Sequence, residues 1–253
     1  MQSFIGSHDL ALVALSYVIS VVGALVSLYL ADFIVERNGR INFGWLTLAA
    51  VVFGGCAIWA MHFIGMLAFR MDGPVTYDIG TTFLSLGLPV ALSGIGLYAA
   101  YRWRESTSAW LLAGLAFGLG VAAMHYVGMS AMRMPMAMQH DNLITALSIG
   151  IAIAAATAAL RIIVHWRGAL RLFSPLLMGL AVCGMHYTAM SGMSFIPIEE
   201  AGAGIDYFQG AWTENAIGFL AGLWATMALF IGAALAVFRT LSSVDDLESL
   251  EGA

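Results

Sequence analysis

The chain has 253 residues, of which 61% are apolar and only 10% are charged. Because a soluble domain carries about 25% charged residues, this composition excludes an ordinary water-soluble globular protein. The net charge of −5, with ten Arg and no Lys, also argues against nucleic acid as a partner, since a phosphate-binding surface needs clustered basic residues. The two Cys lie inside apolar runs and do not form the pattern of a disulfide framework.

Seven apolar runs are each long enough for a transmembrane helix, which needs about 20 residues. Their approximate bounds are 10–31, 43–69, 79–101, 109–132, 143–164, 172–196 and 216–238. These runs predict an all-α integral membrane protein whose membrane domain covers residues 1–238, followed by a short cytoplasmic tail at 239–253. The start of the chain has no basic region or small-residue cleavage motif, so we expect the first span to be retained and not to be a signal peptide.

Two features interrupt this simple pattern. Pro89 lies in the middle of the third span, where it removes a backbone donor and is expected to kink the helix. The segment 197–215, between the last two spans, is acidic and rich in Gly, and its sequence does not assign it a structure.

The Arg residues predict the orientation, because short cytoplasmic loops are enriched in basic residues. Eight of the ten follow spans one, three, five or seven: Arg37, Arg40, Arg102, Arg104, Arg161, Arg167, Arg171 and Arg239. Only Arg70 and Arg133 lie on the opposite side. We therefore expect the N-terminus outside and the C-terminus in the cytoplasm, with Trp103, Trp110 and Trp166 as aromatic anchors at the inner ends of their spans.

One short segment occurs three times, late in the second, fourth and sixth spans. The copies read MHFIGMLA from Met61, MHYVGMSA from Met124 and MHYTAMSG from Met185. Their His residues are 63 and 61 positions apart, so the repeating unit is a pair of spans. The sequence thus predicts three internal two-helix repeats plus a seventh helix, with all three motifs toward the outer face.

Each copy places a His four residues before a Met: His62 with Met66, His125 with Met129, and His186 with Met190. On a helix these side chains stand one above the other, with β-carbons about 5–6 Å apart, so an imidazole and a thioether can face the same ion. Imidazole and thioether together favour a soft or borderline metal, since Mg and Ca prefer oxygen ligands and structural Zn prefers thiolate and imidazole. We predict that these six residues bind copper, as Cu(I) or Cu(II), in one site or in several.

Other Met residues are weaker candidate ligands. Met132 and Met193 continue the stripe of the second and third copies, where the first copy has Phe69. Met61, Met124 and Met185, directly before each His, are rotated by about 100° and either pack on a neighbouring helix or reach an ion held by another one. In the run 132–140, Met alternates with other residues, which suggests an exposed chain that collects Cu(I), or else an apolar loop on the membrane surface.

Less specific interpretations compete with metal binding. A single His in a span more often bonds to another helix, and a Met stripe more often fills a core. Against this, 12 of the 15 Met lie in the three motifs or the loops directly after them, and core packing gives no reason for that bias. The hydroxyls of Tyr126 and Tyr187 could bond to a ligand His, a bound diatomic molecule or the membrane interface. Cys183 could be a deeper ligand, but Cys56 and Cys183 are better explained as small apolar residues.

With Met185-His186-Tyr187-Thr188 and its two relatives on spans two, four and six, the chain resembles the bacterial MHYT domain, an integral membrane sensor module of the cytoplasmic membrane. The first copy departs from the motif at Phe63 and Ile64, and the second at Val127. The resemblance implies a sensory role in which copper near the outer face detects oxygen, carbon monoxide or nitric oxide. It also implies a cytoplasmic output domain or partner, so this chain is expected either to act alone or to be a part from which such a domain has been removed.

The leading hypothesis is therefore a copper-binding signalling sensor and not an enzyme, with the lipid bilayer, a metal ion and a diatomic gas as its partners. One alternative is copper uptake, although a pathway across the bilayer should show polar groups through the depth of the spans. The other is a membrane redox protein in which paired His residues hold copper or haem.

Overall fold

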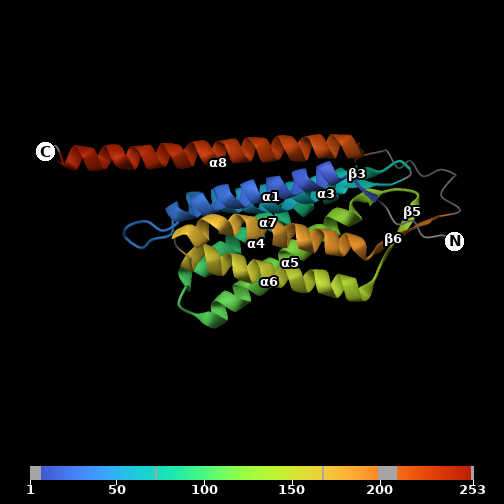
Figure 1. The fold of residues 1–253 in the computed structure, drawn as a ribbon, viewed down its shortest axis with the longest axis horizontal. Coiled ribbons are helices and arrows are strands. Elements are labelled where there is room, and N and C mark those ends of the chain that lie inside the picture. Colours follow the sequence, from blue (N-terminus) through green and yellow to red (C-terminus); the bar gives the residue numbers. More distant parts are fainter. Residues whose placement is uncertain (1–6, 72, 167, 199–209, 252–253) are drawn as a thin grey trace.

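The computed structural model describes residues 7–71, 73–166, 168–198 and 210–251. Most of the segment 197–215, and Arg167, which contributed to the predicted orientation, lie outside these residues. In the described part of the chain, seven helical spans are long and apolar enough to cross a membrane, as the sequence predicts. They lie side by side along the long axis of the molecule (Figure 1).

The spans are built from the following helices. Span one is α1 (Leu10–Leu30), extended by a short 3₁₀ turn, η1 (Ala31–Phe33); span two consists of α2 (Phe43–Val52), a π-helical segment, η2 (Phe53–Ala60), and α3 (Met61–Ala68). The others are α4 (Ile79–Arg102), α5 (Thr107–Ser130), α6 (Asn142–His165), α7 (Gly168–Ser191) and α8 (Glu214–Glu251). Pro89 lies inside α4 as expected, and α8 continues without a break past residue 239, where the tail was predicted to begin.

Short strands correct three predicted span ends. The sixth span was expected to reach residue 196, but α7 ends at Ser191 and is followed by β6 (Met193–Pro197). Spans two and four likewise end before β2 (Phe69–Arg70) and β4 (Met132–Arg133). These strands are partly buried, and so they are rich in apolar residues, as a membrane helix is. Apolar composition therefore did not distinguish strand from helix at these positions.

The strands show that the repeat includes more than its two helices. Three antiparallel pairs join the start and end of each helix pair: β1 (Ser7–His8) with β2, β3 (Thr76–Asp78) with β4, and β5 (Met136–His140) with β6. A further strand, β7 (Ala211–Thr213), pairs with the other edge of β3 and leads into α8. The structure therefore contains three strand–helix–helix–strand units and an added helix.

An Asp caps the first helix of every unit. Asp9, Asp78 and Asp141 accept hydrogen bonds from backbone amides in the first turns of α1, α4 and α6. An N-cap carboxylate satisfies amides that have no partner within the helix, and it complements the helix dipole. These caps give the three units the same starting point, and so the three motifs lie at a similar depth.

Span two is the centre of the bundle. In its most apolar stretch, 89% of the residues are buried, whereas the share of buried residues in the corresponding stretches of α1, α6 and α8 is 28%, 28% and 22%. The other helices pack in the order α1, α7, α6, α5, α4, with α1 and α4 both against span two, while α8 packs outside against α1 and span two. Ser20 and Ser27 of α1 donate hydrogen bonds to the Ala57 and Ala49 carbonyls of span two. This arrangement brings the motif-bearing helices α3, α5 and α7 together.

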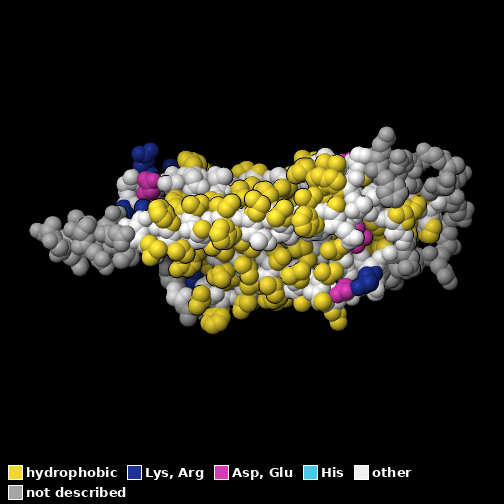
Figure 2. Space-filling view, turned by 90° about the horizontal axis from the view of Figure 1, so that it is seen from above, with side chains coloured by type: hydrophobic (Ala, Val, Ile, Leu, Met, Phe, Trp, Pro, Cys, Tyr) yellow, Lys and Arg dark blue, Asp and Glu magenta, His cyan; other side chains and the backbone are white. Residues whose placement is uncertain are grey.

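The surface of the bundle suits a bilayer. Apolar side chains cover its middle, and charged side chains appear near its two ends (Figure 2). On α8 alone, Phe219, Phe230 and Phe238 are 70%, 74% and 70% exposed. A continuous exposed apolar belt of this kind is unfavourable in water and favourable in hydrocarbon. The chain is accordingly a multi-pass membrane protein.

Candidate metal centre

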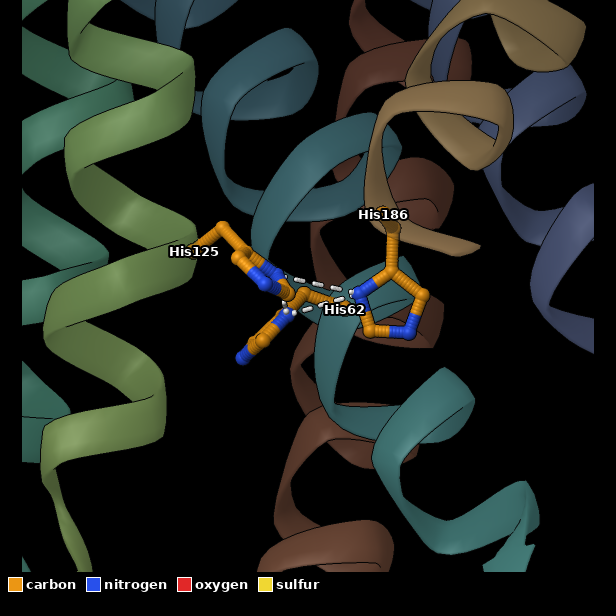
Figure 3. A group of neighbouring side chains, drawn as sticks. All are labelled: His62, His125 and His186. Carbon is orange, nitrogen blue, oxygen red and sulfur yellow. Dashed lines mark hydrogen bonds between the residues drawn. The ribbon is translucent and has the colours of Figure 1, made fainter. Parts of the chain in front are cut away.

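The three motif histidines meet at one point inside the bundle. His62 of α3, His125 of α5 and His186 of α7 turn their rings toward each other (Figure 3), and each is at most 1% exposed. Their Nδ1 atoms are 3.1 Å apart for His62 and His186, 3.2 Å for His62 and His125, and 3.2 Å for His125 and His186. In the described part of the chain, they form the one group of three or more His, Cys, Asp or Glu side chains close enough to hold a metal ion.

Neutral histidines alone do not satisfy this triangle. A ring nitrogen of neutral imidazole carries either a hydrogen or a lone pair, so it can donate or accept but cannot do both. Whichever tautomers are chosen, at least one of the three Nδ1 contacts joins two lone pairs or two N–H groups. Several positive charges together in an apolar interior would be costlier still. A cation that accepts all three lone pairs would remove this conflict.

The spacing fits a metal ion. Three atoms about 3.2 Å apart are equidistant from a point roughly 1.8 Å from each of them, and metal–imidazole bonds are about 2.0–2.1 Å long. An ion just outside the Nδ1 plane would therefore reach all three nitrogens. It would also keep an open coordination position, as in tri-histidine zinc enzymes. The three buried histidines can thus form a metal site.

Two glycines, whose role the sequence analysis missed, allow the rings to approach. A β-carbon added to Gly65 would lie 2.6 Å from Nε2 of His186, and one added to Gly128 would lie 2.6 Å from Nε2 of His62. Both glycines come three residues after their own His, and the third copy has Ala189 there. Each therefore makes room for the histidine of another repeat. Their shared position in the motif was the available signal, but spacing alone does not show which ring a glycine faces.

The Nε2 atoms of all three histidines are buried and have no hydrogen-bond partner among the described residues. A ligand histidine usually donates its second N–H to a carboxylate, carbonyl or water. Here the tight packing around the rings fixes their orientation instead, as the contacts at Gly65 and Gly128 show. The centre is therefore held by shape more than by outer hydrogen bonds.

The predicted Met ligands are buried on the same helices. Met66, Met129 and Met190 are 1–3% exposed and lie one turn beyond their histidines, toward the strands. The weaker candidates are also buried, at 0–8% exposure: Met61, Met124, Met132, Met185 and Met193. Burial alone does not distinguish a ligand from a core residue, so thioether ligation stays a prediction.

The run at 132–140 is extended, but it does not present its thioethers to solvent. Met132 and Met134 are 8% and 6% exposed, and Met136 and Met138 are partly buried and pack against the core. Strands β4 and β5 hold this run through their pairing with β3 and β6. The prediction of an exposed collecting chain is therefore wrong, and much of the run forms paired strands instead of a loop. The alternation of Met reflects strand geometry, in which every second side chain turns inward.

The motif tyrosines bond to serines on a neighbouring helix. Oη of Tyr187 lies 2.8 Å from Oγ of Ser16, and Oη of Tyr126 lies 2.7 Å from Oγ of Ser148. Each serine donates its own hydrogen to a carbonyl of its helix, so the tyrosine is the donor. Among the described residues, these hydroxyls bond to serines and not to a ligand His, which was one of the predicted partners.

The first copy replaces this tyrosine bond by another. Phe63 has no hydroxyl, and Nε1 of Trp59 donates instead to Oγ of Ser85, at 3.1 Å. Ser16, Ser85 and Ser148 each lie seven residues after the Asp cap of their unit. Each accepts its bond from the motif span of another unit, so the three units are joined to one another at the same level. Cys183 is buried and does not belong to the group of potential ligands.

A layer of aromatic rings and ion pairs covers the centre on the strand side. His8, Tyr77 and His140, each directly before an Asp cap, lie against Tyr187, Phe63 and Tyr126 at ring-centroid distances of 5.5, 5.6 and 5.7 Å. Partial burial lowers the pKa of His8, so its ring is neutral at pH 7. These rings separate the histidine centre from water.

Two of the caps also form ion pairs with the strand that ends their unit. Arg70 reaches Asp9 at 2.5 Å, and Arg133 pairs with Asp78. The Arg70 guanidinium, with two helix amides, lowers the pKa of Asp9. For Asp78, the backbone amide and then the hydroxyl of Thr81 lower the pKa most, and Arg133 adds to the effect. Both carboxylates therefore remain charged at pH 7 and link the two ends of their units.

Comparison with known proteins supports the resemblance to the MHYT domain. A family described as "MHYT: Bacterial signalling protein N terminal repeat" matches residues 55–113 and again 118–174. The chain is 38% identical over 212 residues to the bifunctional diguanylate cyclase/cyclic di-GMP phosphodiesterase MucR of Pseudomonas aeruginosa, covering 80% of this chain and 31% of that protein. No solved structure matches.

Two further relatives show the same partial coverage. The cyclic di-GMP phosphodiesterase NbdA of Pseudomonas aeruginosa is 36% identical over 197 residues, which cover 74% of this chain and 24% of the relative. The signaling protein YkoW of Bacillus subtilis is 30% identical over 201 residues, which cover 75% of this chain and 24% of the relative. The chain thus corresponds to less than a third of the length of these signalling proteins.

Proposed function

Because this chain belongs to the MHYT family of bacterial membrane signalling modules, we propose that it is a sensor that binds copper at its three-histidine centre and detects the metal itself or a diatomic gas bound to it. The observation that supports this proposal is the convergence of the three Nδ1 atoms at 3.1–3.2 Å in a water-excluded interior. Among the described residues, no other group offers three such ligands.

Copper is preferred over zinc because of the ligands nearby. The three histidines suit either metal, but buried thioethers lie one turn away on all three helices, at Met66, Met129 and Met190. Thioethers favour Cu(I) and contribute little to a zinc site. A centre with three nitrogens and soft sulfur nearby can stabilise Cu(I) and leave one position for carbon monoxide, nitric oxide or oxygen.

The signal would leave through α8. This helix packs directly on α3 and η2, the segments that carry His62 and the turns before it. A β-carbon on Gly218 of α8 would lie 2.7 Å from the Leu67 side chain, so the two helices touch closely beside the centre. The π-helical form of η2 is a rare arrangement that is often found at functional sites. A change in metal ligation at His62 would thus shift span two against α8, and with it a cytoplasmic output domain or partner.

Metal analysis and infrared spectroscopy test this function. The protein purified in detergent, loaded with Cu(I) and dialysed, should retain one copper per chain, and His125→Ala and His186→Ala should retain much less. Carbon monoxide added to the Cu(I) form should give a C–O stretching band that is absent from both variants. If the protein retained copper but showed no such band, the proposal of a copper sensor would stand, and carbon monoxide binding at this centre would be excluded.

The two alternative functions have less support in this geometry. Toward the Arg-rich end, the cavity that begins at Met185 is lined only by apolar side chains, with two thioethers among them, so it offers no polar relay for copper transport. For haem, two axial histidines on one iron hold their nitrogens about 4 Å apart on opposite sides of a macrocycle, roughly twice a metal–nitrogen bond. The three Nδ1 atoms here are closer than that and leave no space for a porphyrin.

A further inference from the structure

A lipid-facing groove lies at the opposite end of the bundle from the histidine centre. It is formed by α5, α6 and α7, and its volume is about 530 Å³. Small residues form much of its wall, including Ala154 and Ala158, and Leu177 and Met178 complete its apolar side. A groove of this shape and lining, open on the hydrocarbon side of a transmembrane bundle, suits an acyl chain.

The mouth of the groove is basic and aromatic. Arg161, in the last turns of α6, lies with its guanidinium 5.2 Å from the ring centroid of Trp110 of α5, and Trp166 lines the same groove just beyond α6. Such stacking holds the guanidinium in place and leaves the N–H groups at its edge available for an anion. Trp at this level is typical of the membrane interface.

No acidic side chain among the described residues forms a salt bridge with Arg161. Within the described ranges, salt bridges involve Arg70, Arg104, Arg133 and Arg171, and none involves Arg161. Arg161 is exposed and belongs to the end of the bundle that carries most Arg residues, which is the cytoplasmic end by the predicted orientation. An unpaired cation at that level attracts anionic headgroups of the inner leaflet.

We propose that this groove binds one anionic phospholipid, with its phosphate headgroup on Arg161 and one acyl chain along α6 and α7. The proposal does not depend on metal binding. The groove has Ala155, Ala159, Met178 and Ala181 in common with the small cavity that extends to Met185, next to His186. Lipid in the groove therefore packs against a wall that it shares with the cavity lined by Met185.

Native mass spectrometry tests the proposal. Purified protein is titrated with phosphatidylglycerol and with phosphatidylcholine of the same acyl chains, and bound lipid is counted. We expect tighter binding of phosphatidylglycerol, and a loss of roughly five- to tenfold in its affinity for Arg161→Gln, as for one charge at the membrane surface. The matched control is Arg102→Gln, which removes an exposed Arg at the same end of the bundle but outside the groove, and it should retain the preference.

A second variant tests the acyl-chain part of the groove. Ala158 is exposed on the lipid side of α6, so Ala158→Phe fills the groove without disturbing the core, and it should weaken binding of both lipids. Equal affinity of the unaltered protein for the two lipids would overturn the proposal. So would unchanged binding in both Arg161→Gln and Ala158→Phe, or a protein dimer that Ala158→Phe dissociates, because the groove would then hold a second copy of the chain.

Discussion

Substitution of Gly65 by Ala tests whether the precise position of the histidine rings matters. The new β-carbon would lie 2.6 Å from Nε2 and 3.0 Å from Cδ2 of His186, whereas ordinary van der Waals contact begins near 3.4 Å. The ring must therefore move by about 0.8 Å, or α3 and α7 must separate by that amount. A metal site tolerates displacements of its ligand atoms of roughly 0.5 Å. A shift of about 0.8 Å would therefore place Nδ1 of His186 too far from its position in the Nδ1 triangle for normal metal binding.

The expected result is a 10- to 100-fold loss of Cu(I) affinity, the range typical of changes around metal ligands. Affinity can be measured by competition with a chromogenic Cu(I) chelator in detergent. The matched control is Gly184→Ala on α7, two residues before His186, where an added β-carbon meets no atom within 4 Å. This control removes a helical glycine and should bind copper normally, with stability unchanged or raised by about 0.4–1 kcal/mol.

Thermal unfolding of both variants separates a damaged site from a damaged fold. Gly65→Ala should still unfold cooperatively, because the strain is confined to the contact with His186 and Tyr187. If Gly65→Ala bound Cu(I) as tightly as the unaltered protein, the Nδ1 triangle would not be the metal site, and the reasoning from packing to ligation would be refuted.

Three further predictions concern neighbouring residues. Replacing both Met129 and Met190 by Leu, which conserves volume, should lower Cu(I) affinity at least about tenfold and leave Zn(II) affinity unchanged, and equal Cu(I) affinity would remove the thioethers from the ligand set. Tyr187→Phe breaks the bond to Ser16 and should reduce the free energy of unfolding by about 0.6 kcal/mol with normal copper binding, whereas lost copper binding would assign the hydroxyl to the site. Asp78→Ala removes a cap and an ion pair and should cost about 1 kcal/mol at pH 7, with Asp78→Asn costing less because Asn also caps helices. Since the pKa of Asp78 is lower in the folded chain than its ordinary 3.8, its contribution is complete above that pH and disappears as the pH falls through the folded value, so an unfolding difference that persisted unchanged in acid would contradict the assignment.

The sequence was sufficient to predict the seven spans, the repeat and the histidines. Apolar runs of about 20 residues have few alternatives to membrane helices, and three copies at one spacing indicate equivalent helices. The repeat also predicted that His62, His125 and His186 share a depth, because each lies five or six residues before the end of its helix. Their convergence was a reasonable expectation from this symmetry, although sequence alone leaves open whether they form one site or several.

The finer features depend on contacts between residues far apart in the chain. The strands at 132–140 and 193–197 depend on pairing with each other and with β3, so their apolar composition alone suggested a loop and a longer helix. The bonds from Tyr126 and Tyr187 to serines are another example, because Ser16 is 171 residues from its partner. The role of Gly65 likewise follows from a ring on another repeat. Such cross-repeat contacts have no local sequence signal.

X-ray absorption at the copper edge tests the central claim most directly, because it reports the atoms bonded to the metal. For the Cu(I)-loaded protein, the centre should show three imidazole nitrogens at roughly 2.0 Å, and this signal should fall when His62 is replaced by Ala. Copper coordinated mainly by sulfur or oxygen, or a spectrum unchanged in His62→Ala, would contradict a metal site formed by His62, His125 and His186.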